Sequence, residues 1–260
     1  MAKIMGGLEG EPLDLDFHFP NLTHLKMDAS TAYQIEDSLS MTNLPKLTHL
    51  SISSSTNISE MIENYHTPHA GITSLHVAGT FNPEDGNYAV VKLVNLFPAV
   101  TEFKLNVAIE FIEYAYSGEY IGRKDVQTQN ILPLKETLQS LGGWELTCGG
   151  DVEVKFEYVV RGYSFEELDA VGTAVLQGAA EWKGLGNTCL KFVVTWVGET
   201  YKLLDGMRDA LLSCGSIRRV TWEGFEMDEQ DSIELNSFIG ENNVPVSVPD
   251  PGWLNDLWTD

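Results

Sequence analysis

Cysteine, long apolar stretches and basic side chains are all scarce in this chain of 260 residues. Cys148, Cys189 and Cys214 are far apart and form no Cys-x-x-Cys pair, so neither a disulfide framework nor a structural zinc site is expected. No apolar run reaches the roughly 18 residues that a bilayer-spanning helix needs, and no signal-peptide pattern follows Met1. We therefore expect a soluble intracellular protein, cytoplasmic or alternatively nuclear.

The shortage of basic residues limits the partners that the chain can bind. Lys and Arg number 16 against 38 Asp and Glu, which gives a formal net charge of −22. Nucleic acids and anionic membranes are held by Lys and Arg, so we expect neither as a partner. The segment 223–260 carries ten acidic side chains and no basic one. With 43% hydrophobic and 21% charged residues, the composition is nevertheless that of a folded globular protein.

The motifs of common enzymes are missing as well. The sequence has no His-Glu-x-x-His, no Gly-x-Ser-x-Gly, no phosphate-binding Gly-x-x-x-x-Gly-Lys and no dinucleotide-binding Gly-x-Gly-x-x-Gly. Its carboxylates are so numerous that no pair can be singled out as a general acid and base. We therefore expect a protein that is not an enzyme, with no cofactor and no bound metal.

What the chain does contain is an internal repeat, whose shared form is apolar-Thr-x-apolar-x-apolar after a residue that is often Pro. Successive copies begin 25, 25 and 28 residues apart, and a looser match lies at Ile217–Trp222. The four aligned copies are 19–27, 44–52, 69–77 and 97–105.

The repeat has a direct physical interpretation. In an extended strand Leu25 and Met27 point to one side, while His24 and Lys26 point to the other. Such a short strand is unstable alone but becomes stable when it stacks in parallel on an identical neighbour, with a helix or turn as the return path. The pattern predicts a ladder at the preceding threonine and a buried column beside it. The ladder is Thr23, Thr48, Thr73 and Thr101, and the column is Leu25, Leu50, Leu75 and Phe103.

The second half of the chain keeps a similar apolar spacing but with different residues. The ranges 141–146 and 189–194 fit the same apolar spacing, and 152–158 alternates as a strand does. The pattern leaves open which of 141–146 and 152–158 joins the main sheet. Helices are predicted over 164–182, 201–213 and 231–239, the first opened by a capping box at Ser164 and the last ended by Gly240.

These features resemble those of leucine-rich-repeat proteins, and the motif Phe-Pro-x-Leu-Thr-x-Leu is similar to the repeats of F-box/leucine-rich-repeat proteins. The F-box itself is not among these residues. The resemblance implies an α/β leucine-rich-repeat solenoid with a curved parallel sheet on the concave side and helices on the convex side. We expect an N-terminal extension or cap at 1–18, the solenoid at 19–240 and an acidic segment, a cap, at 241–260.

Side chains on the concave strand face are the candidate binding residues, because the repeat holds them in rows. Three of them are histidines, which a metal ion or a pH switch could use, although the simpler interpretation is a solvated polar row. The predicted protein-binding residues are His24, Lys26, His49, Ser51, His76, Glu102, Lys104 and Arg219.

Two functions remain open at this point. The first is a scaffold for protein–protein interaction, which the F-box resemblance extends to the substrate-recognition region of a ubiquitin-ligase adaptor, with a ubiquitination substrate as partner. The second is an acidic inhibitor or chaperone-like binder of a basic protein, whose binding would weaken strongly as the salt concentration rises.

Overall fold

The chain was examined in a computed structural model, which describes 2–5, 18–29, 39–62, 65–81, 83–110, 135–157, 165–182, 188–194, 202–214, 219–223, 227–244 and 246–247. Within these ranges, no helix combines the length and the apolar composition that crossing a bilayer would require.

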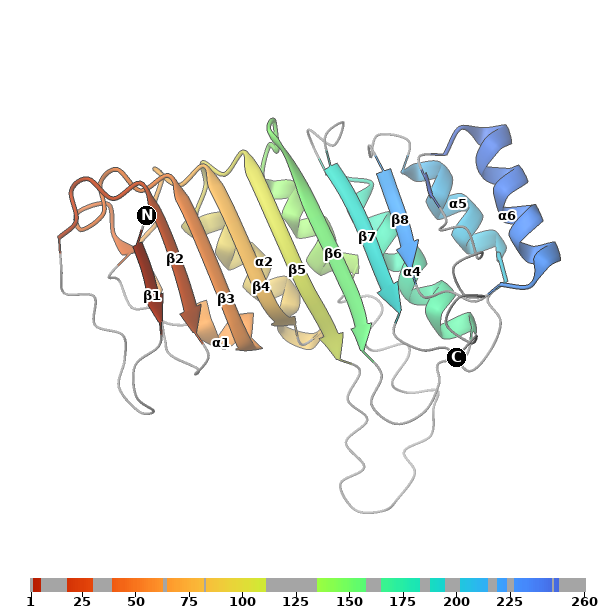
Figure 1. Ribbon diagram of the computed structural model, residues 1–260, viewed down its shortest axis with the longest axis horizontal. Helices are drawn as coiled ribbons and strands as arrows, with labels where there is room; N and C mark the ends of the chain where they lie inside the picture. Colours follow the sequence, from red (N-terminus) through yellow and green to blue (C-terminus); the bar gives the residue numbers. More distant parts are fainter. Residues whose placement is uncertain are drawn as a thin grey trace, which may run out of the picture.

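One parallel sheet runs the length of the protein (Figure 1). Nine strands of the described residues form it, and each strand pairs in parallel with the strand that precedes it in the chain. The order of strands in the sheet is therefore the order in the sequence. The strands are β1 Ala2–Met5, β2 His24–Ala29, β3 His49–Asn57, β4 Ser74–Phe81, β5 Glu102–Glu110, β6 Gly149–Glu157, β7 Thr188–Val194, β8 Arg219–Glu223 and β9 Val246–Ser247.

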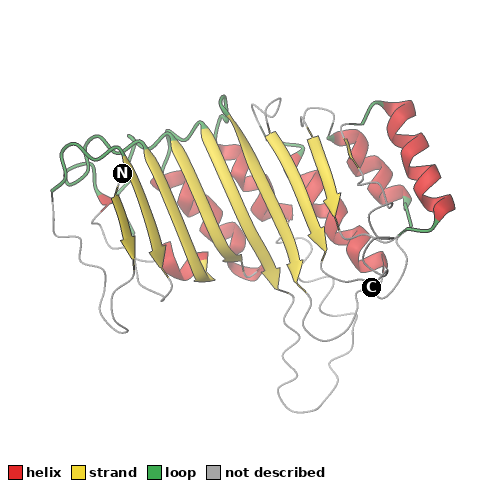
Figure 2. Ribbon diagram, in the orientation of Figure 1, coloured by secondary structure: helices red, strands yellow, loops and turns green. Residues whose placement is uncertain are grey.

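Helices cover one face of this sheet and leave the strands visible on the other (Figure 2). This two-layer α/β arrangement follows from parallel pairing, because each strand must be reached by a crossover that returns to the same end of the sheet. The helices are α1 Ile58–Ile62, α2 Pro83–Leu96, a helical stretch at 135–140 that leads into the 3-10 turn η2 Leu141–Gly143, α4 Phe165–Ala179, α5 Asp205–Ser213 and α6 Glu229–Asn242.

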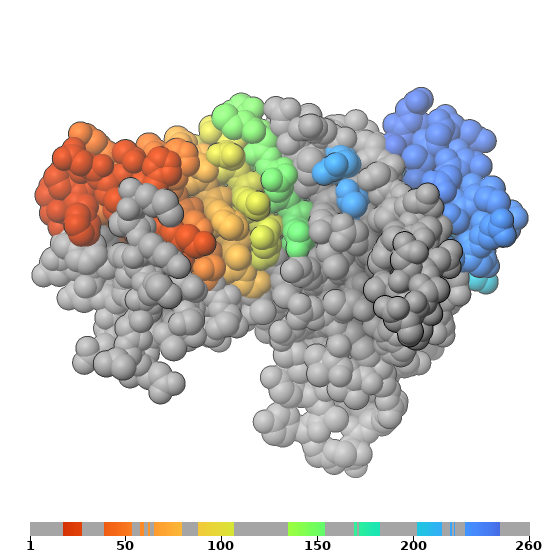
Figure 3. Space-filling model, viewed as in Figure 1, coloured from red at the N-terminus to blue at the C-terminus, as the bar shows by residue number. Residues whose placement is uncertain are grey.

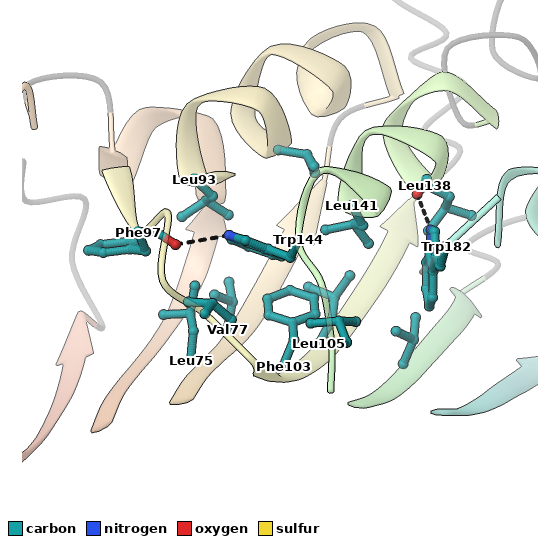
Figure 4. Close-up of a cluster of buried hydrophobic side chains, with 14 of the residues drawn as sticks. Leu75, Val77, Leu93, Phe97, Phe103, Leu105, Leu138, Leu141, Trp144 and Trp182 are labelled. Carbon is teal, nitrogen blue, oxygen red and sulfur yellow. Dashed lines mark hydrogen bonds between the residues drawn. The ribbon is translucent and has the colours of Figure 1, made fainter. Parts of the chain in front are cut away.

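The core lies between the sheet and the helices. The predicted column is confirmed: its four side chains lie on consecutive strands in register and are each no more than 3% exposed. Phe103 packs against Trp144, with 4.8 Å between ring centroids, and Leu93 of α2 closes the cluster from the helix side (Figure 4). The column members are Leu25, Leu50, Leu75 and Phe103.

The threonine ladder is also confirmed. The hydroxyl of Thr48 donates to the carbonyl of Thr23 at 3.2 Å, and those of Thr73 and Thr101 donate to the preceding threonine carbonyl at 3.4 Å. These bonds join consecutive repeats at the end of the sheet where the strands begin. In each of these bonds the hydroxyl proton is donated to the backbone carbonyl of the threonine in the preceding repeat.

Buried side-chain donors join the connecting segments in the same way. Each donates to a backbone carbonyl of the connection before it, which satisfies an acceptor that water cannot reach. The two tryptophan bonds are drawn in Figure 4. The pairs are Tyr65 to Leu39, His69 to Leu44, Trp144 to Phe97 and Trp182 to Leu138.

The second half differs from the prediction in its register. Of the two segments that could have joined the main sheet, the later one does so, because β6 occupies 149–157. The range 141–146 is instead η2 and the loop after it, and its apolar side chains Leu141, Trp144 and Leu146 are buried. On β7 and β8, the residues beside Val152 are Leu190 and Val220. The apolar spacing had placed β7 four residues and β8 two residues away from this register, because a shift by an even number of residues keeps the same side chains on the same face.

The ends of the last helices and of the sheet also need correction. Helix α6 continues through Gly240 to Asn242, and its C-cap Asn243 adopts the left-handed conformation with φ of 51°. Asp228 caps its start by accepting the Asp231 N–H at 2.8 Å. Helix α4 begins at Phe165, and Ser164 lies outside the described residues. The predicted terminal segments 1–18 and 241–260 each contribute an edge strand, β1 and β9.

Candidate functional site

Polar side chains on the face of the sheet opposite the helices form the candidate site, and we call this surface the open face. Strand pairing aligns them in two rows that cross the sheet. The first row is His24, His49, Ser74, Glu102 and Gly149 on β2 to β6. The second row is Lys26, Ser51, His76, Lys104 and Asp151 on β2 to β6, and strand pairing continues it through position 189 of β7 to Arg219 on β8.

The structure places all eight predicted site residues on this open face. Six are exposed, whereas Ser51 and His76 are only half-buried rather than fully exposed as predicted. Arg219 lies in the second row, three strands beyond Lys104, and not in line with His24. Figure 3 shows the described part of this face as a strip of side chains from orange to green.

Two of the histidines stack on each other. The rings of His24 and His49 lie 4.0 Å apart between centroids with an interplanar angle of 14°. Nδ1 of His49 is 2.9 Å from the hydroxyl oxygen of Thr48, whose proton goes to the carbonyl of Thr23. When the Thr48 proton is in the bond to Thr23, Nδ1 of His49 is the donor in its bond to Thr48. Its Nε2 then carries the lone pair and is the nitrogen left to accept a proton.

This stacked geometry does not suit a shared metal ion. An imidazole lone pair lies in the plane of its ring, so an ion about 2.1 Å from both nitrogens would sit outside both planes. His76 is one strand further along and in the other row, with Nδ1 3.2 Å from the hydroxyl oxygen of Ser51. In the described ranges, no three His, Cys, Asp or Glu side chains are grouped so that they could hold a metal.

His76 is the histidine of the open face whose surroundings most affect its charge. Its partial burial lowers its pKa, and the positive charges of Lys104 and Lys26 in the same row lower it further. Its Nε2 is buried and has no hydrogen-bond partner among the described residues. The neutral ring thus retains an unused polar nitrogen between two cations.

A shallow hollow of about 330 Å³ lies where β4, β5 and β6 begin. Gly149 and Gly150 line it at the start of β6. Gly149 has a φ of 92°, and a Cβ on Gly150 would lie 2.7 Å from the carbonyl oxygen of Phe103, so neither position readily accepts a larger residue. The polar residues around it are Ser74, His76, Glu102, Lys104, Cys148 and Asp151.

Sequence reasoning missed the β6 side of this hollow. The paired glycines directly before an alternating strand were a usable signal, because glycine inside a strand often marks a close backbone approach. The register of 152–158 was unknown, however, so Gly149 and Asp151 could not be placed beside Glu102 and Lys104. Only the long-range pairing of β5 with β6 brings them together.

Charge is unevenly distributed over the open face. None of the described side chains that β2, β3 and β4 present on this face is a carboxylate, whereas Glu102, Asp151 and Glu153 follow on β5 and β6. The β2–β4 part, with Lys104 at its border, is a histidine- and lysine-bearing surface on a chain of net charge −22. We call it the imidazole–lysine patch, which comprises His24, Lys26, His49, Ser51, His76 and Lys104.

No model of a protein family matches this sequence, and no curated protein matches it. The function must therefore be argued from the open face itself. What that face offers is hydrogen-bonding groups and charges, fixed at strand spacing on a rigid sheet.

Proposed function

We propose that the chain is a leucine-rich-repeat solenoid that binds another protein through the open face of its sheet. The single observation that carries the proposal is the pair of rows, in which polar residues follow the repeat on consecutive strands. A solenoid uses such rows as an extended recognition surface.

The sheet holds these side chains ready for binding. The threonine ladder fixes the start of each strand, and the buried column fixes the opposite face, so the backbone loses little conformational freedom when a partner docks. Interfaces also draw most of their binding energy from a few side chains in pockets. The glycine-lined hollow between Glu102 and Asp151 offers such a pocket for one large side chain of the partner.

The F-box resemblance makes this proposal more specific. If the repeats act as they do in F-box/leucine-rich-repeat proteins, the bound protein is a substrate that is presented for ubiquitination. Cytoplasm or nucleus would then be the compartment, which agrees with the low cysteine content.

A second function is supported by a different part of the molecule. The end formed by α5 and α6 carries many exposed carboxylates, and of the two described cations there, Arg208 is paired with Glu234. This end could mask a basic protein, as an acidic inhibitor or chaperone does. The exposed carboxylates are Asp205, Asp209, Asp228, Glu229, Glu234 and Glu241.

The test is affinity capture of partners with a variant of the open face. We expect the triple variant His49→Ala, His76→Ala, Arg219→Ala to lose the partners that the wild-type chain captures. The matched control, Lys46→Ala, Glu136→Ala, Glu241→Ala, changes three side chains away from this face and should retain them. Circular dichroism checks that both variants fold.

Two results would count against the open face. Unchanged capture by the triple variant would show that binding occurs elsewhere. Loss of capture in the control, together with binding that collapses as salt rises, would favour the acidic α5–α6 end.

A further inference from the structure

We propose that the imidazole–lysine patch binds a carboxylate-rich segment of the partner protein, and binds it more tightly as the pH falls. This inference rests on the proposed function of the same face and adds the chemistry of the partner. It concerns the patch on β2 to β5 alone, because the charge of the open face changes at β5 and β6, where Glu102, Asp151 and Glu153 introduce carboxylates.

Charge complementarity is the first argument. Lys26 and Lys104 are exposed, and no ion pair involves either of them in the described part of the chain. On a chain with more than twice as many acidic as basic groups, such cations would be expected to have acidic partners nearby. Both charges are therefore available to an incoming anion. A short carboxylate segment carries fewer charges than nucleic acid, so the net charge of −22 repels it less than it repels the dense phosphates.

The fixed tautomer of His49 is the second argument. Its Nδ1 donates to Thr48, so Nε2 is a lone pair in the neutral ring and a charged N–H donor in the protonated ring. The neutral ring therefore presents an acceptor, which disfavours a carboxylate. The protonated ring presents a donor, and a charge-assisted bond becomes available. Binding of a carboxylate is thus coupled to uptake of a proton.

The neighbouring charges decide how this coupling acts. His24 stacks on His49 from β2, and Lys26 on β2 and His76 on β4 lie in the neighbouring row of the same face. Lys104 and Glu102 approach from β5, and register places Lys3 of β1 beside Lys26 and Asp28 of β2 beside Ser53. Lys104 and Lys26 lower the pKa of His76 in the free protein, in addition to its partial burial. A bound carboxylate offsets them, so protonation is favoured when the segment is bound.

The probe is a short fluorescent peptide that alternates Glu with Ser, followed by anisotropy at physiological salt. Imidazoles change charge between about pH 5 and pH 8, while Glu stays largely ionised above about pH 5. We expect affinity for this peptide to rise about fivefold or more from about pH 7.5 to about pH 5.5. A peptide that alternates Gln with Ser should show weak binding with no such rise.

Matched variants locate the effect on the patch. Lys26→Gln with Lys104→Gln should weaken binding of the Glu peptide by about fivefold at both pH values, as the loss of two surface ion pairs predicts. Lys46→Gln with Lys202→Gln removes the same charge from exposed lysines off this face and should change affinity less than about twofold. His49→Gln should reduce the pH dependence.

Four outcomes would overturn the proposal. They are equal binding of the Glu and Gln peptides, tighter binding of a Lys-Ser peptide, tighter binding of a single-stranded oligonucleotide, and equal loss in both lysine variants. Any of these, combined with lost partner capture by the open-face triple variant, would leave the proposed function standing with a different partner chemistry. Unchanged capture by that triple variant would instead overturn the proposed function itself.

Discussion

His69 is a buried histidine whose hydrogen bonds fix its protonation state. It is fully inaccessible, its Nδ1 accepts the N–H of Gly71 at 3.3 Å, and its Nε2 lies 3.1 Å from the carbonyl oxygen of Leu44. Because Nδ1 accepts, the ring is neutral and its single proton is on Nε2. Burial is the main cause that lowers the pKa of His69 below its ordinary value.

This lowered pKa predicts a loss of stability in mild acid. Between the folded pKa and the unfolded value of about 6.5, the unfolded chain binds more protons, so stability falls as the pH drops below about 6.5. His76, whose pKa is also lowered, adds to the slope. We expect the urea midpoint to fall from about pH 7.5 to about pH 5.5, and to fall less steeply in His69→Gln.

The comparison for this prediction is His18→Gln, at an exposed histidine. That variant should keep the wild-type slope. The same slope in His69→Gln would show that the ring does not resist protonation in the folded state.

At the scale of elements, glycines show how tightly the helices pack. A Cβ on Gly178 of α4 would lie 2.7 Å from the carbonyl oxygen of Lys135 and 2.9 Å from Cβ of Leu138, in the helical stretch at 135–140. Gly240 of α6 has open space around it. The same residue type therefore serves close packing in one helix and has no packing role in the other.

The two glycines predict opposite effects of one substitution. Gly178→Ala should destabilise the fold by about 1–3 kcal/mol, because the backbone of the neighbouring stretch must move. Gly240→Ala should stabilise it by about 0.5–1 kcal/mol, since alanine favours an exposed helix interior. Thermal melts of both variants check this. A stable Gly178→Ala would mean that α4 and the 135–140 stretch are not in close contact.

The elements also show how far the sequence could predict the fold. The first four repeats share the same residue pattern. Its spacing alone therefore predicts the strands, the buried column and the threonine ladder from β2 to β5. From β6 onward, the sequence has apolar residues at further alternate positions, such as Phe192 and Trp222, and spacing cannot distinguish registers that differ by an even number of residues. The rows of the site were predictable for the same reason as the strands. The hollow and the tautomer of His49 depend on pairing and on the Thr48 hydroxyl, which no spacing reveals.

At the scale of the whole molecule, charge opposes compactness. With 38 acidic and 16 basic residues, like charges are brought together when the chain folds. We expect the melting temperature to rise as NaCl is raised from about 0.01 M to about 0.15 M, because the screening length shortens from about 30 Å to about 8 Å. The variant Asp209→Asn, Glu241→Gln should melt higher at low salt and respond less. A melting temperature that fell with added salt would show that ion pairs outweigh repulsion.

The order of the strands has a consequence for how the protein is made. Every strand pairs with one that has already left the ribosome, so no early strand must wait for a distant partner before it is covered on one side. Each newly synthesised repeat can dock on the edge that the previous one exposes, so the growing edge of the sheet is paired as soon as the next strand is made. Synthesis and folding can then proceed in the same direction and in the same steps, which limits the time that any apolar strand face is open to aggregation.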